Sequence, residues 1–332
     1  MTVEVQQHRH VPVNGMWLPN AITERMEPMI TKLRLMSVRN LNKQLPVFFA
    51  FLCLFSAASY ALVIHSRHLD APLSRFTMWC PGFAALCTCL FLRIPVGSLG
   101  WGWPAPRFLK LAYFLPLIYA APVYLITWLT IHGTFSLESF EATMSTMYGL
   151  GTWPVFGTFA VALPLLFTVN VIATCVWALG EELGWRGFLF PRLHQRFGFH
   201  GACLISGAIW AGWHFPGLLW ADYNVGTNRF FAMTCFTVGV VAMAYIMGYL
   251  RLRSGSIWPC VLIHASHNTF VQGIYDQLTA PVGVAKYITS EFGAGLALSI
   301  VIAAVVVVSK GRRENGLRHG NEMSLETVAS HQ

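Results

Sequence analysis

The sequence predicts an all-α, polytopic membrane protein with about eight transmembrane helices. Of its 332 residues, 55% are hydrophobic and only 11% are charged, and the apolar residues fall in long blocks. These blocks approach the ~20 residues that a helix needs to cross a bilayer. A soluble domain carries about 25% charged residues, which disfavours a soluble two-domain enzyme. The formal net charge of +8 does not indicate a nucleic-acid partner, because the Lys and Arg residues lie almost entirely between and outside the apolar blocks.

The elements follow in order along the chain. Residues 1–45 mix charges with turn formers and predict a cytosolic arm that contains an interfacial helix. We expect no cleavable signal peptide, because the first apolar run begins only near Leu45. Eight apolar blocks then predict one span each: 46–66, 75–93, 108–131, 156–195, 200–220, 230–250, 257–273 and 291–309. The block 156–195 is too long for one straight span, so it must tilt, kink or protrude. Residues 46–310 thus form a membrane domain, and residues 311–332 a disordered cytosolic tail.

The charges between the blocks predict the orientation of the chain. With the N-terminus inside and eight spans, 18 of the 22 Lys and Arg residues fall in inside segments. The outside loop 132–153 has no Lys or Arg and carries Glu138 and Glu141. The positive-inside rule therefore places both termini in the cytosol, and we expect an integral protein of a bacterial plasma membrane. The eight Cys residues lie in or at the edges of apolar blocks, where small packing residues are favoured over disulfides.

Two carboxylates stand inside an apolar block. Of the 14 acidic residues, only Glu181 and Glu182 do so, and an ionisable group at membrane depth is a functional candidate. On a helix, Glu182 and Arg186 are i,i+4 neighbours and can pair, while Glu181 is displaced by about 100° and faces elsewhere. One glutamate can then be a charge partner while the other is free for proton chemistry. The competing interpretation is a structural ion cluster near a helix end.

A histidine on the next predicted helix reaches the same depth. Gly198 predicts a turn, with Glu181 17 residues before it and His214 16 residues after it. In an antiparallel pair of helices, the two side chains would then meet inside the protein. The alternative is a structural histidine that hydrogen-bonds a backbone carbonyl or stacks on an aromatic ring such as that of Trp210.

A third polar group lies in the block 257–273. His264 and Asn268 are i,i+4 and share a face, so both can present donors to one point. His267 is rotated away by about 100° and is interpreted as structural. Cys260 lies on the face of His264, which invites a thiol-protease interpretation. Adjacent turns of one helix do not readily place a thiol between a base and a substrate, so a packing Cys is favoured.

These motifs together resemble a known family. Glu-Glu-x-x-x-Arg, aromatic-x-x-x-His and His-x-x-x-Asn follow one another on successive predicted helices within residues 155–272. This order resembles the CAAX prenyl protease and bacteriocin-processing family of intramembrane glutamic proteases, also called the abortive-infection family. Glu182 and Arg186 complete the first motif. Trp210 stands where that family often has Phe.

The resemblance implies an intramembrane glutamate-dependent endopeptidase that cleaves near the cytosolic side of the membrane. It implies that Glu181 is the catalytic glutamate, that His214 helps it to activate water, and that His264 and Asn268 line the oxyanion site. Its partners would be the lipid bilayer and a peptide or protein substrate that is lipid-modified or membrane-associated. No cofactor or metal is expected.

Two alternatives stay open. Glu181, His214 and His264 could hold Zn²⁺ with water in the fourth position, although the usual His-Glu-x-x-His signature of zinc proteases is absent. The chain could instead be a non-catalytic membrane protein, such as an immunity, secretion-chaperone or transport protein that uses the same buried charges. Activity that survives loss of Glu181 would distinguish this second alternative.

Overall fold

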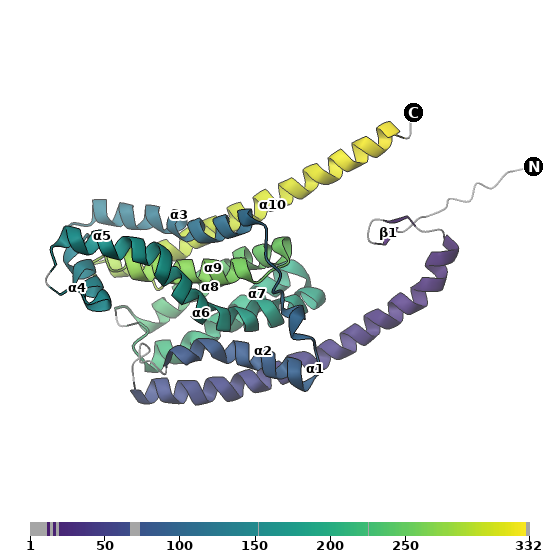
Figure 1. Cartoon of the computed structure of the whole chain (residues 1–332), viewed down its shortest axis with the longest axis horizontal. Coiled ribbons are helices and arrows are strands. Elements are labelled where there is room, and N and C mark those ends of the chain that lie inside the picture. Colours follow the sequence, from purple (N-terminus) through teal and green to yellow (C-terminus); the bar gives the residue numbers. More distant parts are fainter. Residues whose placement is uncertain are drawn as a thin grey trace, which may run out of the picture.

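The computed structural model describes residues 12–13, 16–17, 20–66, 74–151, 153–224 and 226–329. They form a bundle of helices whose long axes run in roughly the same direction (Figure 1). The α-helices are α1 (Asn20–Ser66), α2 (Cys80–Phe91), α3 (Pro106–Thr130), α4 (Leu137–Tyr148), α5 (Val155–Leu165), α6 (Val171–Glu182), α7 (Phe190–Trp220), α8 (Arg229–Ser254), α9 (Trp258–His267) and α10 (Ala294–Ala329). Short 3-10 segments are η1 (Ser74–Trp79), η2 (Val96–Leu99) and η6 (Ala285–Tyr287).

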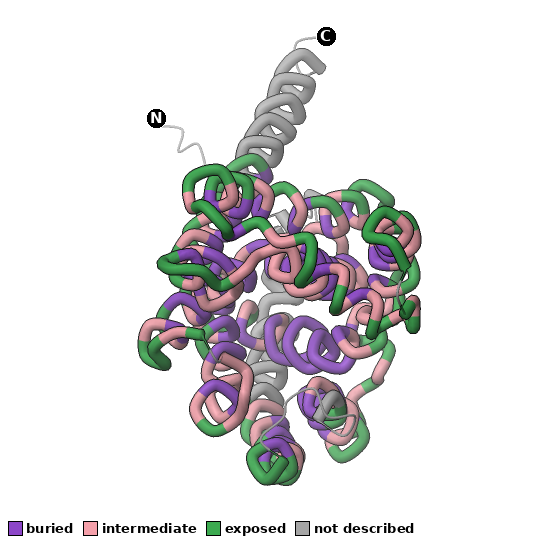
Figure 2. The backbone as a smooth tube through the Cα atoms, turned by 90° about the vertical axis from the view of Figure 1, so that its left-hand side faces the viewer, coloured by how far each residue is buried: buried purple, intermediate pink, exposed green. Residues whose placement is uncertain are grey.

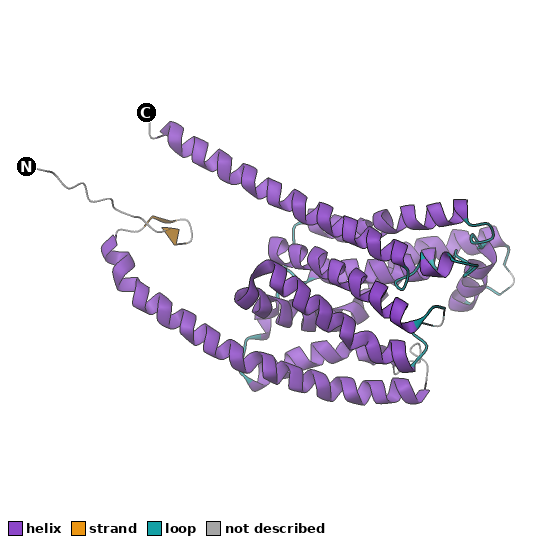
Figure 3. Cartoon of the chain, turned by 180° about the vertical axis from the view of Figure 1, so that it is seen from behind, coloured by secondary structure: helices purple, strands orange, loops and turns teal. Residues whose placement is uncertain are grey.

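The prediction of an all-α, polytopic membrane protein is confirmed. Helices dominate the described chain, and most connections lie at the ends of the bundle (Figure 3). Five helical stretches are long and apolar enough to cross a membrane: Asn42–Ser66, Pro106–Thr130, Val155–Trp220, Arg229–Ser254 and Ala294–Gly311. Phe76–Phe91 is a shorter apolar helix. Strand pairing within the described residues is limited to β1 (Pro12–Val13) against β2 (Met16–Trp17), and an isolated bridge between Phe135 and Thr279.

The longest apolar stretch is bent at a glycine. Val155–Trp220 has 66 residues and is helical except at Gly198, which adopts φ 67° and ψ −174°. A positive φ is easily accessible only to glycine, so this residue allows the chain to turn back. The predicted turn at Gly198 is confirmed, and the block 156–195 is divided further by π-helical segments.

Three π-helical segments interrupt the α-helices. They are η3 (Leu166–Asn170), η4 (Leu183–Leu189) and η5 (Asn268–Tyr275). η4 begins directly after Glu182, and η5 begins at Asn268. A π-turn widens the helix locally and occurs often at functional sites. Two of the three segments, η4 and η5, thus lie at the polar residues that the sequence singled out.

One helix was not anticipated. The loop 132–153 contains α4, whose first turn is capped by the Ser136 hydroxyl, which accepts a hydrogen bond from the Ser139 N–H. Phe140 and Met144 turn their side chains into the bundle and are fully buried. A helix of 12 residues with so few apolar positions gives no signal in a search for membrane spans.

Both long terminal helices leave the bundle at the same end (Figure 1). α1 includes residues 20–45 of the segment predicted as an arm, and α10 continues through residue 329 of the segment predicted as a disordered tail. Residues 1–11, 14–15 and 18–19 of that arm, and residues 330–332, lie outside the described residues.

The surface of the bundle carries large apolar side chains, as a lipid-facing surface does. Buried positions turn toward the centre of the bundle, and exposed positions lie on its outer faces and at its ends (Figure 2). The most exposed apolar side chains of the described helices include Leu90 at 72%, Leu129 at 85% and Phe156 at 84%. In water such a surface would aggregate, whereas in a bilayer it contacts acyl chains.

α2 packs closely on the helix that carries the two glutamates, through glycines. A Cβ added at Gly180 would lie 2.7 Å from the Trp79 ring, and one at Gly184 would lie 2.4 Å from Cβ of Pro81. On the other side of the contact, a Cβ at Gly82 would lie 2.5 Å from the Gly180 carbonyl oxygen. Small residues at such contacts let two helices approach to backbone distance. This contact fixes the position of the backbone on either side of Glu181.

Candidate active site

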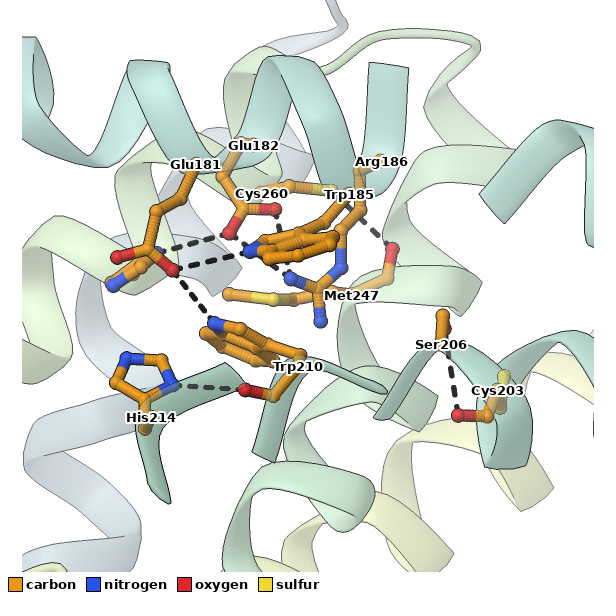
Figure 4. A network of polar contacts seen from close by, with 11 residues as sticks. Glu181, Glu182, Trp185, Arg186, Cys203, Ser206, Trp210, His214, Met247 and Cys260 are labelled. Atoms are coloured by element: carbon orange, nitrogen blue, oxygen red, sulfur yellow. Dashed lines mark hydrogen bonds and ion pairs between the residues drawn. The ribbon is translucent and has the colours of Figure 1, made fainter. Parts of the chain in front are cut away.

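Glu181 and Glu182 are both buried where α6 ends and η4 begins. Their exposed fractions are 1% and 0%. The sequence predicts that they face different partners, and their contacts do differ (Figure 4).

Glu182 is held by two basic side chains. Nη1 of Arg186 donates to both of its carboxylate oxygens, at 3.0 and 3.1 Å, and Nδ1 of His264 lies 2.9 Å from Oε1. Arg186 is itself 1% exposed, and its guanidinium carbon lies 4.1 Å from the centroid of the Trp210 ring. A buried charge is tolerated when it is paired and hydrogen-bonded. The predicted pair of Glu182 and Arg186 is thus present, and His264 joins it.

Glu181 has no cationic partner among the described residues. Its Oε2 accepts hydrogen bonds from two indole N–H groups, of Trp210 at 2.7 Å and of Trp185 at 3.2 Å. Its Oε1 accepts no hydrogen bond from the described part of the chain. Trp210 lies on α7, so its hydrogen bond connects the end of α6 to α7. One oxygen of the carboxylate is held while the other is available to a ligand or to water.

His214 stands on α7 one turn after Trp210. Its Nδ1 lies 2.9 Å from the Trp210 carbonyl oxygen, which can only accept, so Nδ1 carries a proton. In the neutral ring, Nε2 then holds the lone pair. The ring stacks on Tyr223 at 5.8 Å and meets Trp213 edge-on at 4.9 Å. The ring is therefore fixed in orientation by contacts on several sides.

The predicted donor pair on α9 and η5 is only partly as expected. Nδ1 of His264 is used by Glu182, so only its Nε2 is left for a ligand. Asn268 makes no side-chain hydrogen bond within the described residues, and its amide is available as a donor. The His264 ring therefore has one nitrogen left for a ligand, whereas the whole Asn268 amide is available. The i,i+4 spacing alone did not predict this difference.

One cavity brings the four predicted catalytic residues together. It has a volume of about 890 Å³, and its lining includes Glu181, His214, His264 and Asn268. Glu182 and Arg186 do not line it and lie behind this layer. A pocket of this size can hold a short peptide segment, since ligand pockets run from about 300 to 1,000 Å³.

A second polar network on the same cavity was missed by the sequence analysis. Glu291 accepts a hydrogen bond from the Tyr223 hydroxyl at 2.9 Å and another from the Gln272 amide, and Nε2 of His267 lies 3.3 Å from it. Tyr119 contacts the other ring nitrogen of His267. His267 is thus engaged as a structural histidine would be, although it too lines the cavity. The sequence does contain a signal for Glu291, because this acidic residue is the first residue of the last apolar block. Its position at the edge of the block gave no indication that it is buried.

Two carboxyl groups between η5 and α10 have shifted pKa values. Burial would raise the pKa of Glu291, but hydrogen bonds from His267, Gln272 and Tyr223 outweigh burial and lower it to about 2. Burial, opposed by a hydrogen bond from Tyr124, raises the pKa of Asp276 to about 7. Glu291 is therefore a permanently ionised anchor at neutral pH rather than a proton acceptor.

The structure also describes the residues on which the thiol-protease and zinc interpretations depend. Cys260 is fully buried, donates to the Met247 carbonyl oxygen at 3.3 Å and does not line the cavity. Within the described residues, no three or more His, Cys, Asp and Glu side chains are grouped so that they could hold a metal ion. Glu181, His214 and His264, the residues considered for Zn²⁺, thus do not form such a group in the described chain.

Comparisons with known proteins agree with the motifs. Residues 162–270 match the family described as "Type II CAAX prenyl endopeptidase Rce1-like". A curated relative, CAAX prenyl protease 2 of Methanococcus maripaludis, is 28% identical over 152 residues, which cover 44% of this chain and 50% of the relative. The chain thus spans about half the length of the curated relative that it matches. All seven defined residues of the three motifs fall within the matched segment. Residues 162–270 are thus similar to the Rce1-like family of CAAX prenyl endopeptidases.

Proposed function

We propose that this protein is a membrane endopeptidase of the glutamic type, with its reaction centre in the cavity of about 890 Å³. One observation carries the proposal. Glu181, buried at membrane depth, has one carboxylate oxygen held by indole donors and the other free, in a cavity that it shares with His214, His264 and Asn268. A buried acid without a cationic partner is costly, and function is the usual reason for retaining one.

Peptide hydrolysis needs a base, a nucleophilic water, an acid for the leaving amine and a donor for the oxyanion. Glu181 takes a proton from water through Oε1, and the resulting hydroxide attacks the carbonyl carbon of the scissile bond. The lone pair on Nε2 of His214 helps to hold this water. When the C–N bond breaks, Glu181 returns the proton to the leaving nitrogen, so that protons balance over the cycle.

The oxyanion that forms needs donors. The Asn268 amide supplies one, since no described protein group uses it. His264 supplies a second from Nε2 if its ring carries both protons, a state that the adjacent Glu182 carboxylate stabilises. Glu182 and Arg186 therefore support the oxyanion site through His264.

The name of the curated relative suggests the substrate class. We propose a lipid-modified or membrane-associated peptide or protein, cleaved near the cytosolic side of a bacterial plasma membrane, with both termini of the enzyme in the cytosol. The apolar surface of the described helices supports an integral membrane protein.

Comparing membrane peptides from cells that carry the intact protein with those from cells that carry Glu181→Gln tests the proposal. Peptides that accumulate uncut only in the variant identify the substrate. Cys260→Ala is the matched control, because Cys260 is buried away from the cavity, and its peptide profile should equal that of the intact protein. Identical profiles for intact protein and Glu181→Gln, with function retained, would favour the non-catalytic alternative. Activity that vanishes on chelation and returns with Zn²⁺ would instead favour a metalloprotease.

A further inference from the structure

Trp210 contacts both members of the proposed catalytic pair. Its indole N–H donates to Oε2 of Glu181 at 2.7 Å, and its backbone carbonyl oxygen accepts from Nδ1 of His214 at 2.9 Å. Trp210 is 5% exposed and lines the cavity. One residue thus holds the glutamate through its side chain and the histidine through its backbone (Figure 4).

A second indole assists at the same oxygen. Trp185, one turn after Glu181 and fully buried, also donates to Oε2, at 3.2 Å. We call Trp185 and Trp210 the indole pair. Two donors on one carboxylate oxygen fix the rotation of the carboxylate, and hydrogen bonds to an ionised acceptor are about twice as strong as neutral ones. Because the carboxylate is planar, the hydrogen bonds to Oε2 also fix the position of Oε1, the oxygen without a donor.

The ring of Trp210 is itself held in place. The Arg186 guanidinium lies over one face, with its central carbon 4.1 Å from the ring centroid. The His264 ring meets it at 5.4 Å with an interplanar angle of 60°. Phe at this position would still supply an aromatic ring, although a smaller one, but it has no N–H. An indole at position 210 therefore supplies a hydrogen-bond donor that Phe would not.

We infer that the indole pair positions Glu181: its two N–H groups hold Oε2 and thereby present Oε1 to the reacting water, with Trp210 as the dominant donor. The inference rests on the proposed function for its catalytic consequence, but the hydrogen bonds themselves can be tested without activity. Neutral donors also compensate the charge of Glu181 without neutralising it, whereas Arg186 would form a permanent ion pair.

The first test is spectroscopic and uses the purified full-length chain in detergent. Ultraviolet resonance Raman spectra report the hydrogen-bond strength of indole N–H groups. The spectrum of the intact protein minus that of Trp210→Phe should show a strongly hydrogen-bonded indole. The same subtraction in a Glu181→Ala background should show a weakly bonded one. A weakly bonded indole in the first subtraction would overturn the inference, whether or not the protein hydrolyses peptides.

The second test is kinetic and uses a peptide identified by the comparison of membrane peptides. Trp210→Phe should lower kcat by about 10- to 100-fold, the scale for one hydrogen bond to a charged group, and leave KM within about 2-fold. Trp185→Phe should lower kcat by a smaller factor, because its hydrogen bond is longer. Trp128→Phe is the control, since it removes an indole donor to Thr279, at 2.9 Å, outside the cavity lining.

The two tests separate the possible failures. If the intact protein cleaves nothing, the proposed function fails, while the Raman test still decides whether the indole pair binds Glu181. If Trp210→Phe retains full kcat, the positioning role is overturned even where the hydrogen bond is present. An equal loss of kcat in Trp128→Phe would also overturn it, because the loss would then follow from general destabilisation.

Discussion

Two neighbouring glutamates have opposite surroundings although they share one turn of helix. Glu182 accepts from Arg186 and contacts His264, and it lies behind the cavity lining. Glu181 accepts only from neutral indole groups among the described residues, and it lines the cavity. Glu182 is thus held by an ion pair, whereas Glu181 is held by neutral donors. The difference in chemistry thus follows from a rotation of one residue along the helix.

The first prediction concerns the ion pair of Glu182 and Arg186. Glu182→Gln or Arg186→Met alone should lower the free energy of unfolding by about 3–5 kcal/mol, because each leaves a buried charge without its partner. The double variant should be more stable than the sum of the single losses predicts. Thermal and denaturant unfolding of the purified protein, combined in a double-mutant cycle, measures the coupling. Strictly additive losses would contradict the pairing.

At the scale of elements, the glycine contact between α2 and α6 positions the site. Gly180 and Gly184 flank the two glutamates, and both approach the start of α2 to distances that a Cβ would not allow. η4 continues the helix with a wider turn directly after Glu182. The backbone that carries Glu181 is therefore held by close packing on one side and by a π-turn on the other.

A glycine pair tests this contact. Gly184→Ala would place a Cβ 2.4 Å from Cβ of Pro81 and 2.6 Å from the Pro81 backbone oxygen. The overpacking should cost about 1–3 kcal/mol of stability and lower the midpoint of thermal unfolding. Gly212→Ala is the control, since no atom lies within 4 Å of the added Cβ, and it should be neutral or stabilising by up to about 1 kcal/mol. Equal midpoints for both variants would show that α2 does not pack as closely as described.

Much of this arrangement follows from local pattern and could be predicted. The eight apolar blocks coincide with helical segments, Gly198 bends the chain, and Glu182 pairs with Arg186 across one turn. What could not be predicted depends on contacts distant in sequence. The i,i+4 rule places His264 beside Asn268, but whether Nδ1 of His264 is free depends on Glu182, 82 residues away. Spacing likewise does not reveal that Trp210 donates to Glu181.

At the scale of the whole molecule, the site depends on segments outside the matched family region. Glu291 precedes α10, beyond residue 270, and its hydrogen bond to Tyr223 anchors the ring that stacks on His214. α4 contributes Met144 and Met147 to the lining of the same cavity. The motifs therefore supply the proposed reactive groups, while other parts of the bundle line the cavity around them and hydrogen-bond the residues that contact them.

The orientation of the bundle in the membrane gives the last prediction. Both terminal helices extend from the same end of the bundle, as we expect of a chain with an even number of crossings (Figures 1 and 3). The distribution of Lys and Arg then predicts which end is cytosolic. In a protein whose native Cys are replaced by Ala, Lys43→Cys, Arg253→Cys and Arg313→Cys should react with an impermeant maleimide only in inside-out vesicles. Glu138→Cys should react only in right-side-out vesicles.

Each outcome of this labelling has a distinct meaning. If all four variants were labelled from the opposite side, the fold would be unchanged but the whole bundle would be inverted in the membrane. That result would contradict the orientation that the distribution of Lys and Arg predicts. Labelling of Arg313→Cys and Lys43→Cys from opposite sides would contradict the even number of crossings itself. The expected pattern instead places the segment 132–153, which contains α4 and Glu138, on the outer side of the membrane. A loop without Lys or Arg is the most readily translocated across the membrane.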